Sequence, residues 1–205
     1  TSHLSKNLPP LAERIRPHVL SEFIGQTNLI HENSLLTKAV ASKQPFSLIF
    51  WGPPGTGKTT LARILSREFG VEYFELSAIS SGVKQVREIL EKGKASFESG
   101  KYSILFIDEI HRFTKSQQDA LLHGVEEGSI TLIGATTENP SFEVISPLLS
   151  RCRVLRLHPL NDLDLECVIK RALENDILLS QKNLQIDDQT KFFLIESCGG
   201  DARND

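Results

Sequence analysis

The fold is decided by residues 46–69, which read FSLIFWGPPGTGKTTLARILSREF. The apolar run Phe46–Trp51 has the length of a buried strand, and the residues that follow the turn predict a helix over Lys58–Phe69. Between them, residues 52–59 fit the pattern G-x-x-x-x-G-K-[ST], whose glycines let backbone N–H groups wrap phosphate oxygens. We therefore expect a strand, a phosphate-binding loop and a helix in direct succession. The alternative interpretation is a glycine-rich turn without a ligand.

This loop and the start of its helix offer three kinds of contact to a nucleotide. The backbone amides and the positive end of the helix dipole favour anions. Lys58 adds a positive charge near the β- and γ-phosphates, and the Thr59 hydroxyl can ligate Mg²⁺. The loop residues expected to bind nucleotide are Gly52, Pro53, Pro54, Gly55, Thr56, Gly57, Lys58, Thr59 and Thr60.

A second apolar run, Tyr102–Ile107, is followed directly by two acids, Asp108 and Glu109. The interval after Lys58 has room for a helix, a strand and a second helix, so the acids can reach the same sheet edge as the loop. We expect Asp108 to hold Mg²⁺ through its water shell and Glu109 to orient and polarise the attacking water. The alternative is that two acids simply cap a strand.

The same acids begin the sequence D-E-I-H, which also matches a D-E-x-H helicase box. That interpretation requires a second motor domain of similar size, and these residues contain none. His111 is therefore interpreted as a structural residue.

Apolar runs and helical patterns alternate along the chain. Strands buried on both faces and separated by helices predict an α/β fold with a parallel five-stranded sheet covered by helices on both sides. The remaining expected strands are Val71–Leu76, Ser129–Thr136 and Val154–Leu157, and the remaining expected helices are Asn33–Ser42, Gly82–Phe97, Lys115–Glu126 and Ser146–Arg151.

After Pro159 the strand pattern stops, and two amphipathic helices are expected, the second over Asp188–Cys198. We predict a nucleotide-binding domain over residues 1–158, in which residues 1–10 form a flexible arm. Residues 159–205 are expected to be the start of a small helical lid domain that is truncated. Because the sequence contains no methionine, we expect it to be part of a longer chain.

The composition is that of an ordinary globular protein, with 205 residues, 40% hydrophobic residues and a net charge of −3. No apolar run approaches the roughly 20 residues of a membrane helix, and no secretory signal is visible. Three scattered cysteines fit a reducing cytosol better than a disulfide scaffold or a zinc site. The charge does not by itself predict nucleic-acid binding, and the basic residues between Lys84 and Lys101 alternate with glutamates, as on a solvated helix face.

Polar residues also follow the expected strand Ser129–Thr136. A side chain there could contact the γ-phosphate or the attacking water, and Thr137 is the first choice and Asn139 the second. Two late arginines, Arg151 and Arg203, would by themselves be interpreted as solvated surface residues.

Taken together, these motifs resemble AAA+ ATPases. Three strings are more specific, and they resemble the replication-associated recombination protein A family (RarA or MgsA), which is related to the Werner-helicase-interacting ATPase, clamp loaders and the Holliday-junction branch-migration motor. The strings are DEIHRFTKSQQD at 108–119, IGATTENPSF at 133–142 and LLSRC at 148–152.

The resemblance implies an ATPase that uses ATP and Mg²⁺ and acts on forked or single-stranded DNA at stalled or damaged replication forks. It also implies a homo-oligomer in the full-length protein, replication and repair proteins as partners, and no membrane. The missing upstream zinc finger of eukaryotic relatives favours a bacterial source, and hence a cytoplasmic, nucleoid-associated protein.

Individual roles follow from the same resemblance. Ile24 and Gly25 fall where such ATPases hold adenine against the backbone, downstream of the signature Arg16-Pro17. Thr137 falls on the position called sensor 1. Arg151 falls on the arginine finger, which acts in trans on the nucleotide of the neighbouring subunit, and Arg203 falls on sensor 2, presented by the lid to nucleotide in its own subunit.

Three other functions stay open at this point. One is a clamp-loader or branch-migration subunit proper, which would require a sliding clamp or a junction-binding winged helix. Another is an ATP-gated scaffold that recruits repair proteins with little turnover, which the intact pair Asp108-Glu109 argues against. A small-molecule kinase would leave the two late arginines unexplained.

Overall fold

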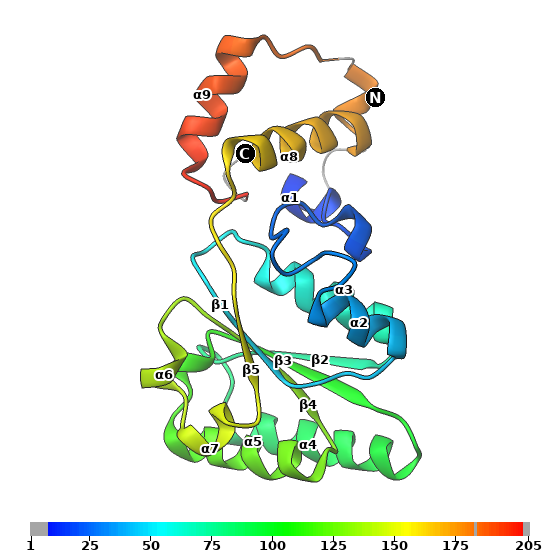
Figure 1. Ribbon diagram of the computed structural model, residues 1–205, viewed down its shortest axis with the longest axis vertical. Coiled ribbons are helices and arrows are strands. Elements are labelled where there is room, and N and C mark those ends of the chain that lie inside the picture. The colour runs from blue at the N-terminus through cyan, green and yellow to red at the C-terminus, as the bar shows by residue number, and fades with distance from the viewer. Residues whose placement is uncertain (1–7, 183, 203–205) are drawn as a thin grey trace.

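The structure, a computed structural model, describes residues 8–182 and 184–202. A five-stranded parallel sheet with the strand order β2-β3-β4-β1-β5 forms the larger part of the molecule, and a smaller helical part lies above it (Figure 1). The predicted fold class is confirmed. The strands are β1 (Leu48–Trp51), β2 (Glu72–Ser77), β3 (Ser103–Asp108), β4 (Thr131–Thr136) and β5 (Arg153–Arg156).

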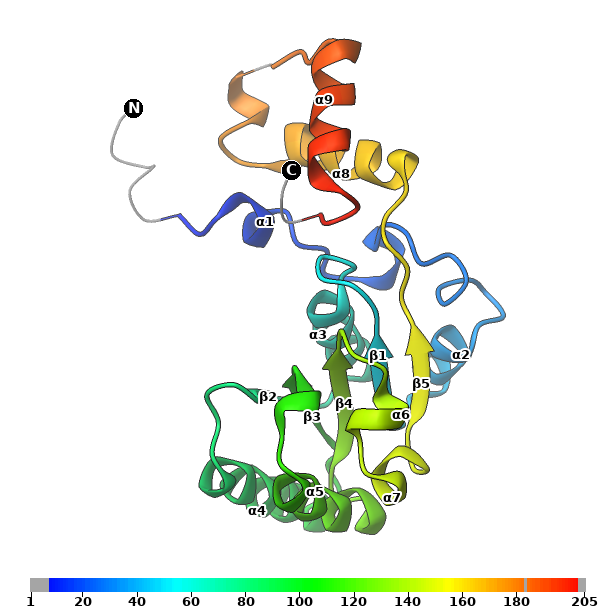
Figure 2. The same cartoon turned by 90° about the vertical axis from the view of Figure 1, so that its left-hand side faces the viewer.

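Helices cover both faces of this sheet (Figure 2). The helices α2 (Leu35–Ser42) and α3 (Lys58–Phe69) pack on one face, and α4 (Val83–Glu98), α5 (Lys115–Glu127) and α7 (Ser146–Leu149) pack on the other. Parallel strands have such coverings because the chain must cross from the end of one strand to the start of the next, and the helix that makes this connection lies on a face of the sheet.

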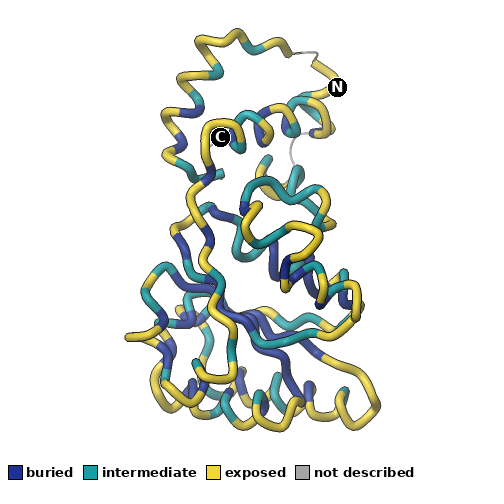
Figure 3. The backbone as a smooth tube through the Cα atoms, viewed as in Figure 1, coloured by how far each residue is buried: buried dark blue, intermediate teal, exposed yellow. Residues whose placement is uncertain are grey.

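Alternate side chains of the central strands lie on opposite faces of the sheet, so the apolar core consists of two clusters. In β3, Ile104 and Phe106 pack with the apolar side chains of α2 and α3, whereas Leu105 and Ile107 pack with those of α4 and α5. All four are fully buried, and Figure 3 shows the central strands as a continuous buried region. Because the side-chain period of a strand is two, both layers of helices are fixed by the same short apolar run.

The outer strands differ from the sequence prediction, which treated all five as buried on both faces. β5 lies at one edge of the sheet, and Arg153, Val154 and Arg156 on it are exposed. The guanidinium of Arg156 lies 5.0 Å from the centre of the Trp51 ring on β1. The prediction failed here because strand order, which decides which strands are edges, is not encoded in an apolar pattern.

The predicted helices Lys58–Phe69 and Asp188–Cys198 have the expected bounds, and the other element boundaries differ by at most two residues. β3 includes Asp108, and the helix expected over Ser146–Arg151 ends at Leu149, because the chain must turn there to enter β5. Several one-turn elements were not predicted, since three or four residues carry too little pattern. They are α1 (Leu11–Arg14), η2 (Leu20–Glu22), η3 (Ile110–Arg112), α6 (Pro140–Glu143) and η4 (Ser180–Lys182).

The helical part consists of α8 (Asp162–Asn175), η4 and α9 (Asp188–Cys198), and it is called the lid below. Asn161 begins α8 as a capping box, in which its side chain accepts from the Asp164 N–H at 2.9 Å. The lid has its own apolar cluster, to which Ile15 and Ile24 of the N-terminal segment contribute. The domain boundary near 158–160 stays a prediction, as does the arm at 1–10, of which residues 1–7 lie outside the described residues.

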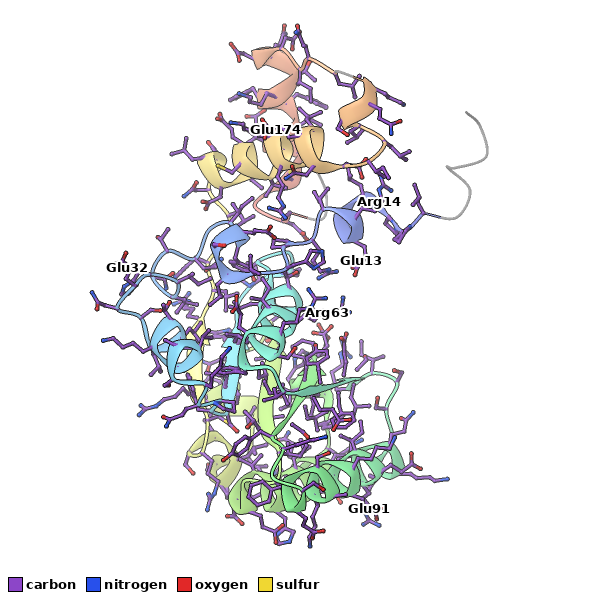
Figure 4. All side chains as sticks on the ribbon, turned by 90° about the vertical axis from the view of Figure 1, so that its right-hand side faces the viewer. Glu13, Arg14, Glu32, Arg63, Glu91 and Glu174 are labelled. Atoms are coloured by element: carbon purple, nitrogen blue, oxygen red, sulfur yellow. The ribbon has the colours of Figure 1, made fainter. Side chains whose placement is uncertain are left out.

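Residues 11–26, called the strap below, connect the lid to the sheet-containing core. Towards the lid, the Arg14 guanidinium donates to both carboxylate oxygens of Asp176 at 2.5 and 3.1 Å. Towards the core, Arg16 donates to the Thr60 hydroxyl at 2.7 Å. Glu13 also pairs with Arg63 of α3 at 3.1 Å, and Figure 4 shows these labelled side chains between α1 and its neighbours. The strap therefore holds the two parts together through charged groups.

The Arg14–Asp176 pair should contribute most to docking of the lid. We expect Arg14→Gln to lower the midpoint of thermal unfolding by roughly 5 °C, because it leaves the buried Asp176 carboxylate without its cation. Lys170→Gln on α8, the helix that ends just before Asp176, removes an exposed pair with Glu174 and should change the midpoint by less than about 1 °C. Equal effects of both substitutions in differential scanning calorimetry would contradict this role.

The same pair predicts a pH dependence. The Arg14 guanidinium lowers the pKa of Asp176 to about 2, with further help from the Leu179 and Leu178 N–H groups. A carboxyl whose pKa is lowered by folding stabilises the fold above its unfolded pKa, near 3.9, and the contribution is lost as pH falls towards 2. The difference in unfolding midpoint between wild type and Arg14→Gln should therefore shrink from pH 5 to pH 2. A difference that is constant over this range would contradict the assignment.

Two further features of the structure concern the cysteines and the apolar character of the helices. All three cysteines are free, and burial raises the pKa of the Cys152 thiol to about 12, which makes it unreactive. In residues 8–182 and 184–202, no helix has both the length and the apolar character needed to cross a bilayer.

Candidate active site

A cavity of about 480 Å³ lies between the core and the lid, at the carboxyl ends of β1, β3 and β4. It is the place where the phosphate-loop motif, the acidic pair and the polar end of β4 meet. Predicted site residues that line it are Ile24, Pro54, Gly55, Thr56, Gly57, Lys58, Thr59, Thr60, Asp108, Glu109 and Thr137.

The loop after β1 is shaped by glycines that no other residue could replace without strain. Gly55 and Gly57 have φ angles of +73° and +92°, in the left-handed region. A Cβ on Gly57 would lie 2.6 Å from the Phe23 ring, and one on Gly55 would overlap the Asp201 carboxylate. Both glycines thus allow close approach by neighbouring segments as well as the turn itself. The loop leads into α3, whose amino end has no side-chain cap.

Lys58 lies on the first turn of α3 and folds back over the loop. Its ammonium donates to the carbonyl oxygens of Gly52 at 2.8 Å and Pro53 at 2.6 Å. The Thr56 hydroxyl also donates to the Pro53 carbonyl, at 3.0 Å. Gly52 itself is packed against the backbone of Leu157, where a Cβ would lie 2.4 Å from the carbonyl oxygen. These contacts fix the loop before any ligand is considered, and they keep a positive charge at its mouth.

The acidic pair lies at the carboxyl end of β3, on the same side of the sheet as the phosphate-binding loop. Asp108 ends the strand, and Glu109 adopts φ +56°, ψ +43°, a left-handed conformation that is rare for a residue with a side chain. Burial raises the pKa of Asp108, as does the neighbouring Glu109, while the Glu109 N–H and the Lys58 ammonium lower it. Lys58 and Asp108, fifty positions apart in the sequence, are therefore within electrostatic reach of each other.

This arrangement suits a divalent cation bound together with phosphates. Burial of the Asp108 carboxylate, together with the nearby carboxylate of Glu109, raises the pKa of Asp108, and a bound cation would offset that cost. The described residues contain no group of three His, Cys, Asp or Glu side chains that could hold a metal alone. The hydroxyl of Thr59 and the carboxylate of Asp108 line the same cavity, and both are hard oxygen donors of the kind that Mg²⁺ prefers.

The carboxyl end of β4 supplies the predicted polar position. Thr137 lines the cavity, whereas Asn139, the second choice, does not appear in its lining. The Asn139 side chain instead begins α6, where its Oδ1 accepts from the Ser141 N–H at 3.0 Å. A short polar residue before a proline is a frequent helix start, which gives Asn139 a structural use.

The opposite wall of the cavity is mostly apolar and comes from the strap and the lid. Ile24 lies there as predicted, and Gly25 beside it has φ +79° and would place a Cβ 2.7 Å from the Leu160 side chain. The next residue, Gln26, exchanges hydrogen bonds of 2.7 and 2.9 Å with the His158 backbone, which ties the strap to the core–lid connection. The sequence analysis did not select several residues of this wall: Ala12, Ile15, Phe23, Leu160, Val168, Arg171 and Ala202.

Among these, Arg171 of α8 is the one charged residue that sequence reasoning missed. It donates to the Ile15 carbonyl and to the Glu22 carboxylate, both at 3.0 Å, and so holds the strap against the lid beside the cavity. Nothing in the local sequence distinguished it from an ordinary solvated helix arginine. Arg16, which the sequence analysis named as part of a signature, lines the same wall.

Of the two late arginines, Arg151 does not line this cavity. Arg151 lies at the amino end of β5, where the Arg153 N–H donates to the Ser47 carbonyl. The loop follows the opposite end of β1, about 13 Å away for a strand of four residues. The Arg151 guanidinium instead pairs with Glu126 at 2.5 Å and donates to the Pro147 carbonyl at 2.7 Å. Arg203 lies outside the described residues.

Comparison with known proteins identifies the family. Residues 48–160, more than half of the chain, match the model of the "ATPase family associated with various cellular activities (AAA)". The chain belongs to this AAA family. The matched range contains the phosphate loop, the acidic pair and all five strands of the sheet.

Individual relatives agree with the narrower resemblance. Replication-associated recombination protein A of Escherichia coli (strain K12) is 46% identical over 195 residues, which are 95% of this chain and 44% of that protein. The ATPase WRNIP1 of Dictyostelium discoideum is 46% identical over 203 residues, which are 99% of this chain and 23% of that protein. The chain thus spans less than half the length of these curated relatives, and the predicted resemblance is confirmed.

A solved structure agrees as well. The RuvB Holliday junction branch migration motor of Thermotoga maritima superposes with a TM-score of 0.75 at 31% identity, over 93% of this chain and 62% of that chain. The lid and the core of this AAA protein therefore have counterparts in an experimentally determined relative.

The contact between Gly55 and the lid can be tested with a matched pair of substitutions. Gly55→Ala and Gly128→Ala both place an alanine at φ +73°, but a Cβ at Gly128 meets no atom within 4 Å. Each should cost about 1 kcal/mol of backbone strain. Only Gly55→Ala should also displace Asp201 and weaken binding of a fluorescent ATP analogue, by at least tenfold. Equal affinity in the two variants, measured by anisotropy, would contradict the role of this contact.

Proposed function

We propose that this AAA protein binds ATP with Mg²⁺ in the cavity between core and lid and hydrolyses it to ADP and phosphate. The observation that carries the proposal is the convergence of Lys58, Thr59, Asp108 and Glu109 on one cavity from two segments that are distant in sequence. The apolar wall that includes Ile24 and Val168 has the character expected of a nucleobase pocket. Gly25 shapes this wall through its close approach to Leu160.

The phosphate end of the nucleotide would be bound by the loop. Backbone N–H groups of residues 55–59 and the amino end of α3 favour the phosphate oxygens, and Lys58 would exchange its contacts with the Gly52 and Pro53 carbonyls for the β- and γ-phosphates. Thr59 and Asp108 would hold Mg²⁺, which supplies charge neutralisation on the phosphate oxygens when bound.

The chemical step would be carried by Glu109 and the end of β4. The Glu109 carboxylate orients a water molecule and accepts its proton as the water oxygen bonds to the γ-phosphorus and the bond to the ADP oxygen breaks. Thr137 lines the cavity directly after the adjacent strand β4, where its hydroxyl can donate to the γ-phosphate or accept from the same water. Arg203 of the lid is proposed as a second cation for the phosphates of the same subunit.

Arg151 is proposed to act in trans, on the nucleotide of a neighbouring subunit. Its position at the amino end of β5 keeps it from the cavity of its own chain, which supports this proposal. Glu126 and Pro147 hold its guanidinium at the surface, where it is 40% exposed and accessible to a second copy. The proposal therefore implies a homo-oligomer in the full-length protein.

The biological role is proposed from the relatives. Their names connect them with replication-associated recombination and with branch migration at Holliday junctions. We infer that the full-length protein uses ATP hydrolysis at forked or single-stranded DNA, together with replication and repair proteins, in the bacterial nucleoid. A branch-migration motor is the second candidate, favoured by the TM-score of 0.75 with RuvB. A panel of forks and four-way junctions, assayed for stimulation of ATP hydrolysis, separates the two.

Glu109→Gln tests the chemical step. It removes the proton acceptor but keeps size and hydrogen-bonding capacity, so we expect hydrolysis to fall at least 100-fold with ATP affinity unchanged. Steady-state phosphate release and ATP titration measure the two quantities. Equal loss of binding and hydrolysis would contradict the assignment of Glu109 as the base.

Mixing experiments test the action of Arg151. In the full-length protein, Arg151→Ala should lower the hydrolysis rate by about 10³-fold or more. Lys58→Ala should be inactive through loss of nucleotide binding. Mixed assemblies should recover activity, because Arg151 of the Lys58→Ala subunit can reach the intact nucleotide site of the Arg151→Ala subunit. Mixtures that remain as inactive as the separate variants, although they assemble, would contradict action in trans.

A further inference from the structure

His111 occupies a position that its assumed structural role does not explain. It lies in η3, directly after the acidic pair, and its side chain is only 12% exposed. One ring nitrogen, Nδ1, is 2.9 Å from the Thr136 hydroxyl on β4. The other, Nε2, is 3.6 Å from Oε2 of Glu109. The imidazole thus stands between the last residue of β4 and the carboxylate proposed as the base.

Thr136 is a fixed point for this imidazole. It is 1% exposed, it ends β4, and the residue after it is Thr137 in the cavity wall. Its hydroxyl also accepts from the Glu138 N–H at 3.0 Å, which holds the turn after the strand. Any shift of this strand end on contact with a γ-phosphate would therefore reach the imidazole directly.

Glu109, in contrast, needs an external support. Its backbone is left-handed, so its side-chain direction is set by contacts rather than by a regular element. Arg112 Nε also lies 3.1 Å from Oε2, but the Arg112 side chain is 58% exposed, and exposed ion pairs hold geometry poorly. Of these two neighbours of the Glu109 carboxylate, His111 is the one shielded from solvent.

We propose that His111 is a positioning residue that orients the Glu109 carboxylate towards the attacking water and couples it to the end of β4. The Thr136 hydroxyl has one proton, and its oxygen also lies 3.2 Å from the Glu138 carbonyl oxygen. This role requires that the proton be donated to Nδ1 of His111, so that the ring proton resides on Nε2 and faces Oε2 of Glu109. The present separation of 3.6 Å closes to a hydrogen bond with a shift of a few tenths of an ångström, as is common when catalytic contacts tighten around substrate. The inference rests on the proposed function of Glu109.

Two amide substitutions separate the two ends of the imidazole. The amide nitrogen of His111→Gln can replace the Nε2 donor to Glu109, whereas the shorter His111→Asn can replace only the contact of Nδ1 with Thr136. In the full-length protein, His111→Ala and His111→Asn should lower kcat by about 10- to 100-fold with unchanged ATP affinity. His111→Gln should stay within about threefold of wild type. His123→Ala, on an exposed histidine of α5, is the control and should have no effect.

Other outcomes overturn the inference. If His111→Asn keeps the wild-type kcat and His111→Gln does not, His111 supports the end of β4 and not Glu109. The same conclusion follows if ATP affinity falls together with kcat, or if all three variants turn over like wild type. The thermal unfolding midpoint of each variant shows whether it still folds. The midpoints of His111→Gln and His111→Asn should lie within a few degrees of each other.

The Glu109→Gln background separates this inference from the proposed function. If Glu109 is the base and His111 acts through it, adding His111→Ala to Glu109→Gln should cause no further loss of the residual rate. A further tenfold loss would show that His111 acts independently of Glu109. If Glu109→Gln alone turns over normally, the proposed function fails, whatever the His111 variants do.

Discussion

The parallel alignment of β1, β3 and β4 is the constraint on which the site depends. Parallel neighbours end at one edge of the sheet, so the residues that follow each strand must meet there. This places the ammonium of Lys58 close enough to Asp108 to lower its pKa, against the effects of burial and of Glu109. The apolar layers on both sides of β3 hold this alignment, because a shift of register by one residue would exchange its two buried faces.

The second half of the cavity belongs to segments outside the sheet. The strap is tied to the lid by Arg14 and to the core by Arg16, while the lid end reaches the phosphate loop through the Ala202 N–H and the Gly55 carbonyl, 3.3 Å apart. A ligand in this cavity therefore contacts both parts of the molecule at once. We propose that nucleotide binding is coupled to the angle between lid and core, because the two parts have separate apolar clusters that are joined by the strap.

The residues of the phosphate-binding loop and the acidic pair could be predicted from the sequence, but several of the other residues that line the cavity could not. Lys58 and Asp108 could be placed together because their motifs fix both residue type and strand end. Arg171 and Phe23 could not, since a helix arginine and an apolar residue in an irregular segment carry no pattern that points to a cavity. The left-handed backbone of Glu109, on which the case for His111 depends, is likewise invisible in a sequence, where only glycine suggests such a conformation.

The most direct test of the account is the position of the metal in a crystal of the protein with a non-hydrolysable ATP analogue and Mn²⁺ in place of Mg²⁺. We expect one anomalous peak between the Thr59 hydroxyl and the Asp108 side chain, with the γ-phosphate beside the Lys58 ammonium. A peak remote from Asp108, or a triphosphate bound away from the loop at residues 52–59, would contradict it.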